Sequence, residues 1–255
     1  MGGAPIACRG AASAAEFERQ WPKTVALLLG VGADILAVTE LENDGYGPDS
    51  AIRHLVDRLD AASAKERWGF VDADAGAGHP DALGADAIKV GLLHRRDAVA
   101  PVGAPAVLDR GAFGPFATTT GTIGRNRPAL AQTYEELASG ERFTVVVLHL
   151  KSKASSCAGN QAPVGPDPDL GDGQGHCNET RRAAVVELAA WLATDPTGAG
   201  DPDVLILGDW NAYTLEDPLG AARGPGPLEP PPAPGAPARP ASASEGAWRG
   251  PGRAL

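Results

Sequence analysis

Three polar clusters, each directly after an apolar run, hold the side chains most able to do chemistry in this 255-residue sequence. In the first, Glu40 and Glu42 follow the apolar run at 34–39. A carboxylate at the end of a buried strand is a hard oxygen ligand of the kind that Mg²⁺ or Ca²⁺ binds. Taken by itself, this cluster is explained as well by an ordinary solvated loop.

The second cluster is His149, Lys151 and Lys153, after the apolar run at 145–148. Side chains alternate along a strand, so an extended chain places all three on one face. Two lysines on one face form a compact phosphate-binding set, and a neighbouring histidine can donate or accept a proton near neutral pH. A lone histidine here would more often be a core residue; the two lysines favour the functional interpretation.

The third cluster is Gly208, Asp209 and Asn211, after the apolar run at 204–207. Gly208 lets the backbone turn sharply, and Asp209 and Asn211 then project from the same side. Asp and Asn also favour turns for purely structural reasons. Their position after a buried strand favours a site, because α/β proteins bind ligands at strand ends.

Strands and helices must bring these clusters together, and hydrophobic periodicity predicts both. Helices are predicted over 13–29, 50–59 and 180–193, and strands over 34–39, 87–94, 129–137, 142–150 and 204–207. The Gly/Pro/Asp-rich segment 154–175 predicts a long loop. Mixed helices and strands in this order predict an α/β protein.

Composition and charge exclude several classes of protein. Hydrophobic residues make up 43% of the chain, which argues against global disorder, and no apolar stretch approaches the ~20 residues of a membrane helix. We expect no signal peptide, because Met1 precedes a Gly/Ala/Pro segment. The net charge of -10 argues against binding nucleic acid by bulk positive charge. It does not argue against carboxylates that gather metal at a phosphate site.

The order of the clusters resembles the endonuclease/exonuclease/phosphatase superfamily, the fold of DNase I. The likeness is greatest to its secreted bacterial ExeM/NucH-like nucleases, and it extends over about residues 8–218. The motifs that carry it are Glu40-Leu-Glu-Asn-Asp-Gly-Tyr, Asn126-Arg-Pro, His149-Leu-Lys-Ser-Lys, Gly171-Asp-Gly-Gln-Gly, and Gly208-Asp-Trp-Asn-Ala.

The resemblance implies a DNase I-like four-layer α/β sandwich. Relatives begin with a strand that ends in Asn and finish with strands that carry an Asp-His motif, and we find neither in this sequence. We therefore expect an incomplete sandwich without the first and last strands. Residues 1–12 would be an N-terminal remnant, 13–218 the partial domain and 219–255 a disordered tail, read from a shifted frame or otherwise unrelated.

The resemblance also implies a mechanism. Glu40 would hold a divalent metal, Mg²⁺ with Ca²⁺ or Mn²⁺ as alternatives, which polarises a phosphodiester oxygen. Asp209 would orient or deprotonate the attacking water and Asn211 would bind the scissile phosphate. His149 would be a phosphate ligand or general acid. The expected contacts to the nucleic-acid backbone are Lys151, Lys153 and Arg127, although an Arg before Pro is equally a structural surface residue.

The three cysteines allow one disulfide and leave one thiol over. Cys157 and Cys177 bracket the long loop, and closing it would stabilise the fold by roughly 3 kcal/mol. The resemblance to a secreted branch favours this disulfide over two free buried thiols. Cys8 would be the residue left over.

We expect a metal-dependent nuclease that acts on DNA in preference to RNA, secreted and monomeric. Because the closing motifs are not found, we expect weak or no activity from the chain as written. Two alternatives stay open. One is a phosphomonoesterase or sphingomyelinase-type member of the same superfamily, and the other is a non-catalytic remnant.

Overall fold

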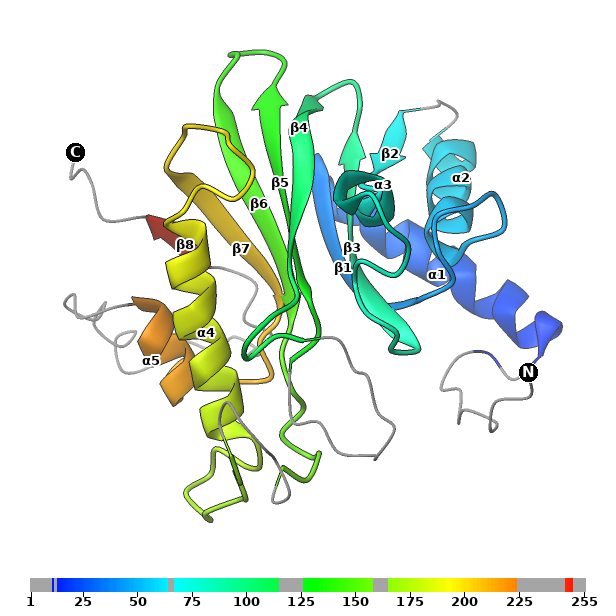
Figure 1. Cartoon of the computed structure of the whole chain (residues 1–255). Coiled ribbons are helices and arrows are strands. Elements are labelled where there is room, and N and C mark those ends of the chain that lie inside the picture. Colours follow the sequence, from blue (N-terminus) through cyan, green and yellow to red (C-terminus); the bar gives the residue numbers. More distant parts are fainter. Residues whose placement is uncertain are drawn as a thin grey trace, which may run out of the picture.

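The computed structural model describes residues 11, 13–63, 67–114, 126–157 and 165–223, and the backbone of 246–249. Two β-sheets face each other, and helices cover their outer surfaces (Figure 1). The layers follow the order helix, sheet, sheet, helix. The predicted four-layer α/β sandwich is thus confirmed, while the predicted loss of its first and last strands stays a prediction.

The first sheet has three antiparallel strands in the order β1-β3-β2. They are β1 (Ile35–Glu42), β2 (Trp68–Phe70) and β3 (Ile88–Arg95). Its outer face is covered by α1 (Ala14–Val31) and α2 (Ala51–Ser63). These helices bury one apolar stripe each against the sheet, with Val25 from α1 and Ile52, Val56 and Leu59 from α2.

The second sheet has five strands in the order β4-β5-β6-β7-β8. They are β4 (Val99–Leu108), β5 (Ala129–Glu136), β6 (Arg142–His149), β7 (Asp203–Asp209) and β8 (Gly246–Arg249). β6 and β7 are parallel, and the other pairs are antiparallel. A parallel pair needs a crossover, and here it carries α4 (Asn178–Leu192) over the outer face, beside α5 (Asp217–Arg223).

Strand β6 is apolar on both faces because it lies between two layers. Val145 and Val147 point to the core between the sheets, whereas Val146 and Leu148 pack beneath α4. This explains the unbroken apolar run that precedes His149.

The sequence prediction did not include β2, β4, β8, α5 or the short helix α3 (Ala73–Ala77). β4 lies at the edge of its sheet and contains Pro101 and Pro105 around a register shift. Edge strands tolerate proline because one side needs no ladder hydrogen bonds.

The predicted boundary at residue 218 falls inside α5, which continues to Arg223. Within the predicted tail, Gly246–Arg249 forms β8. Residues 224–245 and 250–255 of the predicted tail lie outside the described residues. Residues 1–10, which include Cys8, lie outside them as well. No helix in the described ranges is long and apolar enough to cross a bilayer.

Candidate active site

His149 and Asp209 meet at the ends of two neighbouring parallel strands. β6 and β7 pair with His149 opposite Asp209, and the Leu150 amide donates to the Asp209 carbonyl over 2.8 Å. The His149 Nε2 atom lies 3.6 Å from Asp209 Oδ2. Parallel strands end at the same edge of a sheet, which is why two separate sequence clusters come together here.

Gly208 lets the two strands approach each other at this edge. Its φ is +129°, a conformation that L-residues rarely adopt. A Cβ atom at this position would lie 2.0 Å from the Leu148 carbonyl oxygen. Glycine is therefore required directly before Asp209, for close approach as well as for the turn.

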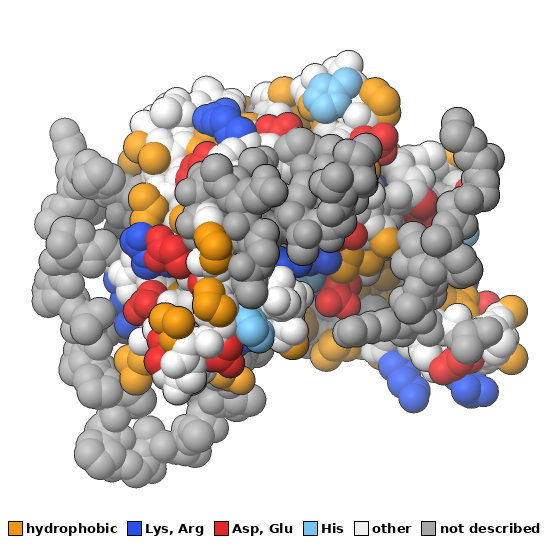
Figure 2. All heavy atoms as spheres, turned by 60° about the horizontal axis from the view of Figure 1, so that its bottom comes forward, with side chains coloured by type: hydrophobic (Ala, Val, Ile, Leu, Met, Phe, Trp, Pro, Cys, Tyr) orange, Lys and Arg blue, Asp and Glu red, His pale blue; other side chains and the backbone are white. Residues whose placement is uncertain are grey.

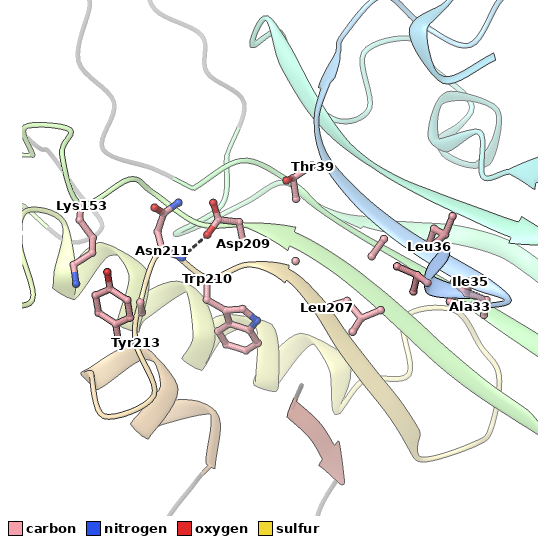
Figure 3. A pocket seen from close by; sticks show the side chains of 14 residues that line it. Ala33, Ile35, Leu36, Thr39, Lys153, Leu207, Asp209, Trp210, Asn211 and Tyr213 are labelled. Carbon is pink, nitrogen blue, oxygen red and sulfur yellow. Dashed lines mark hydrogen bonds between the residues drawn. The ribbon is translucent and has the colours of Figure 1, made fainter. Parts of the chain in front are cut away.

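A tight turn fixes Asp209 and Asn211 relative to each other. The Asn211 amide donates to Asp209 Oδ1 over 2.9 Å, as Figure 3 shows. Asn211 Nδ2 donates to the Leu150 carbonyl over 2.9 Å. Asn211 has a left-handed φ of +46°, which asparagine tolerates well. One oxygen of Asp209 is thus held by the turn, and the other faces His149.

The imidazole of His149 is buried, with its side chain 5% exposed. Burial lowers the pKa of His149, and the nearby Arg127 guanidinium lowers it further. The carboxylates of Asp209, Glu40 and Asp86 oppose this effect. The ring is accordingly neutral at ordinary pH, and its Nδ1 atom has no hydrogen-bond partner among the described residues.

Glu40 stands at a bulge in β1, where the register with β3 shifts between Val38 and Leu41. Its φ is +59°, so the backbone is twisted locally. The side chain is exposed, and its charge acts on His149. The neighbouring polar residues stabilise the local structure. Asn43 donates to two carbonyls, and Asp44 accepts from the first amide of α2.

Glu40 is the predicted metal ligand, and its surroundings can be compared with the way Mg²⁺ binds to proteins. Within the described part of the chain, no group of three or more His, Cys, Asp or Glu could hold a metal alone. Mg²⁺ needs only one or two protein carboxylates, since waters and substrate phosphates complete its shell. Glu40 is exposed and close enough to act on His149. It therefore suits such a shared site better than a closed one.

The three predicted phosphate contacts lie in different surroundings. β6 ends at His149, so strand alternation does not govern Lys151 and Lys153. The Lys153 ammonium pairs with Glu216, and Arg127 Nε donates to Asp86 Oδ2 over 2.6 Å. No ion pair joins the Lys151 ammonium to another described residue.

Structure comparison gives two informative matches. The human Nocturnin catalytic domain with bound sulfate anion aligns with a TM-score of 0.50 and 18% identity, covering 81% of this chain and 62% of that one. An endonuclease/exonuclease/phosphatase family protein from Bacteroides thetaiotaomicron aligns with a TM-score of 0.51 and 12% identity, covering 80% and 59%. The chain has the endonuclease/exonuclease/phosphatase fold. It spans about three fifths of the length of these structures.

At such identities the likeness shows the endonuclease/exonuclease/phosphatase fold alone. No protein-family sequence model matches this chain, and no curated protein matches it at a significant level.

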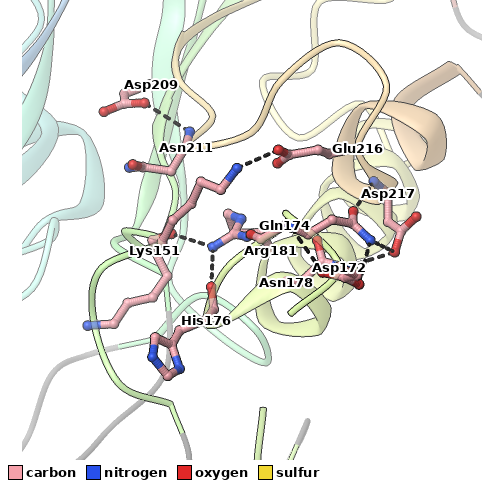
Figure 4. Close-up of polar contacts among 11 residues, drawn as sticks. Lys151, Asp172, Gln174, His176, Asn178, Arg181, Asp209, Asn211, Glu216 and Asp217 are labelled. Atoms are coloured by element: carbon pink, nitrogen blue, oxygen red, sulfur yellow. Dashed lines mark hydrogen bonds and ion pairs between the residues drawn. The ribbon is translucent and has the colours of Figure 1, made fainter. Parts of the chain in front are cut away.

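Two buried residues that received no role in the sequence analysis support the site in this fold. Asn126 accepts from the Lys151 amide over 2.8 Å and donates to the carbonyls of Ala112 and Thr180. Arg181 donates to the carbonyls of Lys151, His176 and Gln174 (Figure 4). Both are fully buried. A signal existed for Arg181, since it shares the apolar face of its helix with Ala184, Val185 and Leu188.

The predicted disulfide between Cys157 and Cys177 is confirmed. Both cysteines are buried, and their Cα atoms are 5.3 Å apart. The disulfide joins the chain after β6 to the start of α4. Beside it, His176 Nδ1 accepts from the Asp169 amide over 2.9 Å.

A groove of about 500 Å³ runs between β1 and β7 and ends at the site. Its floor is apolar, and Lys153, Asp209, Asn211 and Tyr213 form its polar end (Figure 3). Figure 2 views the molecule from the end where the loops lie, and acidic, basic and histidine side chains gather there among apolar ones.

Proposed function

We propose that this chain hydrolyses phosphodiester bonds of nucleic acid, DNA in preference to RNA, as an extracellular nuclease. The pairing of His149 with Asp209 across β6 and β7 carries the proposal. An acidic and a basic side chain at one strand edge, beside a fixed amide, form a set suited to moving a proton next to a phosphate.

Asp209 is assigned to the attacking water. Its side chain is 47% exposed, so a water molecule can reach the carboxylate. The Asn211 amide already fixes one of its oxygens, which limits the orientations that the carboxylate can take. A held carboxylate positions a water molecule better than a mobile one does.

His149 and Asn211 are assigned to the phosphate. Neutral imidazole can donate one hydrogen bond, and the lowered pKa of His149 keeps it neutral. The side-chain amide of Asn211 donates one of its two hydrogens to the Leu150 carbonyl. The second hydrogen is left for a phosphate oxygen. The hydrogen bond to Leu150 fixes the Asn211 donor, which supports electrostatic stabilisation of the transition state.

Glu40 is assigned as the protein ligand of Mg²⁺, for which Ca²⁺ or Mn²⁺ could substitute. When bound, the metal supplies Lewis-acid polarisation of a phosphate oxygen. Lys151 is the lysine assigned to the nucleic-acid backbone, because its ammonium forms no ion pair within the described ranges. Lys153 and Arg127 remain proposed contacts. Because Lys153 pairs with Glu216 and Arg127 pairs with Asp86, each cation must leave its carboxylate or share it with the phosphate.

Secretion and a monomeric state belong to the same proposal. The Cys157–Cys177 disulfide supports secretion, because disulfides persist in oxidising compartments and are rare in the cytosol.

Nicking of supercoiled plasmid with Mg²⁺, and with EDTA as the blank, tests the proposal. Asp209→Asn should lower the rate by about 10²–10⁴-fold. Asp203→Asn, at the exposed start of the same strand, is the matched control and should cleave like the parent. Cleavage that survives in EDTA or in Asp209→Asn contradicts the assignment.

Parallel reactions with a phosphomonoester and with sphingomyelin separate the alternatives. Hydrolysis of either one in place of DNA would assign the chain to that substrate class. A folded chain that cleaves none of the three would be a non-catalytic remnant, and the proposal would fail.

A further inference from the structure

The second lysine of the His-Leu-Lys-Ser-Lys motif faces an acidic side chain at the edge of the site. Lys153 lines the same groove as Asp209 and Asn211. Its ammonium pairs with a carboxylate oxygen of Glu216. The Glu216 side chain is 11% exposed and that of Lys153 is 24% exposed, so water screens this pair less than it screens a surface pair.

Neighbouring groups hold Lys153 in this direction. Its ammonium lies 4.4 Å from the centre of the Tyr213 ring, in cation–π geometry. Its carbonyl accepts from the His176 amide over 3.2 Å. Gly175 lies so close that a Cβ atom there would be 3.1 Å from Lys153 Cβ. The lysine is therefore turned toward Glu216 by contacts on several sides.

Glu216 in turn stands on a fixed part of the backbone. Its amide donates to the Tyr213 carbonyl over 2.9 Å, and its carbonyl accepts from Gly220 in α5 over 3.0 Å. The next residue, Asp217, accepts from the side chains of Gln174 and Asn178 (Figure 4). The backbone that carries Glu216 is therefore held in place beside Lys153.

Glu216 also interacts electrostatically with a second cation, Arg181. Its charge raises the pKa of the buried Arg181, against the lowering by burial. The Glu216 Oε2 atom is buried without a hydrogen-bond partner among the described residues. The Arg181 charge acts on Glu216 independently of Lys153, so opening the Lys153–Glu216 pair leaves this carboxylate under the influence of a second positive charge.

We infer that Glu216 is a positioning residue that holds Lys153 back from the site, so that a substrate phosphate must compete with Glu216 for the lysine. The inference rests on the proposed function, because it assumes an anionic substrate at Asp209 and Asn211. When Lys153 moves from Glu216 to a substrate phosphate, it exchanges one anionic partner for another and keeps an ion pair. Glu216 therefore acts on substrate affinity, and hence on KM, and leaves kcat almost unchanged.

Glu216→Gln keeps the shape of the side chain and removes its charge. We expect it to bind a fluorescein-labelled 12-nucleotide single strand roughly five-fold more tightly at low salt. Because one more phosphate is neutralised, the slope of log K against log salt should steepen by about 0.7. In hydrolysis, KM should fall by the same factor while kcat stays within about two-fold.

The control is Glu135→Gln, which makes the same charge change. Glu135 pairs with Arg142 at the opposite end of β6 from His149. The double variant Lys153→Met/Glu216→Gln should lose the gain in affinity. Anisotropy titrations of the 255-residue chain in EDTA measure binding without turnover, so a chain that binds but does not cleave refutes the proposed function and leaves this inference standing.

Three results would overturn the inference. Glu216→Gln could bind no more tightly than Glu135→Gln, or the double variant could keep the gain. A lower kcat and a lower free energy of unfolding, with unchanged affinity and salt slope, would show that Glu216 has a structural role only.

Discussion

Replacing Gly208 by alanine should separate Asp209 from His149. The added Cβ would lie 2.0 Å from the Leu148 carbonyl oxygen and 2.9 Å from the Leu148 nitrogen. Both are backbone atoms of β6, so no side-chain rotation can relieve the contact. The strands must move apart where Leu148 pairs with Gly208.

Two costs add at this position. The φ of +129° places an alanine in a conformation that costs about 1–3 kcal/mol, and overpacking against backbone costs about 1–3 kcal/mol more. We therefore expect Gly208→Ala to lower the free energy of unfolding by roughly 2–6 kcal/mol. Since the shift lies directly before Asp209, hydrolysis by the fraction that stays folded should also fall, by about 10²-fold.

Urea unfolding followed by circular dichroism measures the stability, and plasmid nicking at a temperature where the variant is folded measures the activity. Gly220→Ala is the matched control, because Gly220 lies in α5 with open space around its Cβ position. That change should be neutral or stabilising by up to about 1 kcal/mol. If the free energy of unfolding of Gly208→Ala lay within about 0.5 kcal/mol of the parent value, as for an ordinary surface substitution, the reasoning would be refuted.

Two further predictions concern stability. Burial lowers the pKa of His94 from 6.5 to about 4, so the unfolded chain takes up a proton first as pH falls. The free energy of unfolding should therefore drop by about 3 kcal/mol between pH 7 and 4. His94→Phe should flatten the pH dependence of urea midpoints by that amount, and an unchanged dependence would contradict the burial argument. Reduction of the Cys157–Cys177 disulfide, which closes a separation of 20 residues, should cost about 3 kcal/mol. Equal urea midpoints with and without dithiothreitol would show that the loop is held by other contacts.

The strand ends of the site were predictable because their strands are buried on both sides. The runs before His149 and Asp209 are apolar without a break, and such runs are typical of strands between two layers. The edge strand β4 gave no such signal, because its exposed side admits Pro101 and Pro105.

The surroundings of the site cations were not predictable. Lys153 and Glu216 are 63 residues apart in sequence, and Arg127 and Asp86 are 41 residues apart. Periodicity describes local structure and does not identify such partners. The start of α5 did carry a local signal, because proline at 218 suits the first turn of a helix, but the composition of the following segment favoured disorder.

The parallel pairing of β6 with β7 also determines when the site can form. Leu150 and Asn211, which hydrogen-bond to each other, are 61 residues apart in sequence. The chain between them, which includes α4, must therefore close into the crossover before His149 meets Asp209. Contacts across long separations form late, since the loop entropy is lost before they are gained. In refolding, recovery of hydrolysis should therefore lag behind recovery of helix and strand signals, so that enzymatic activity reports the completed crossover rather than secondary structure.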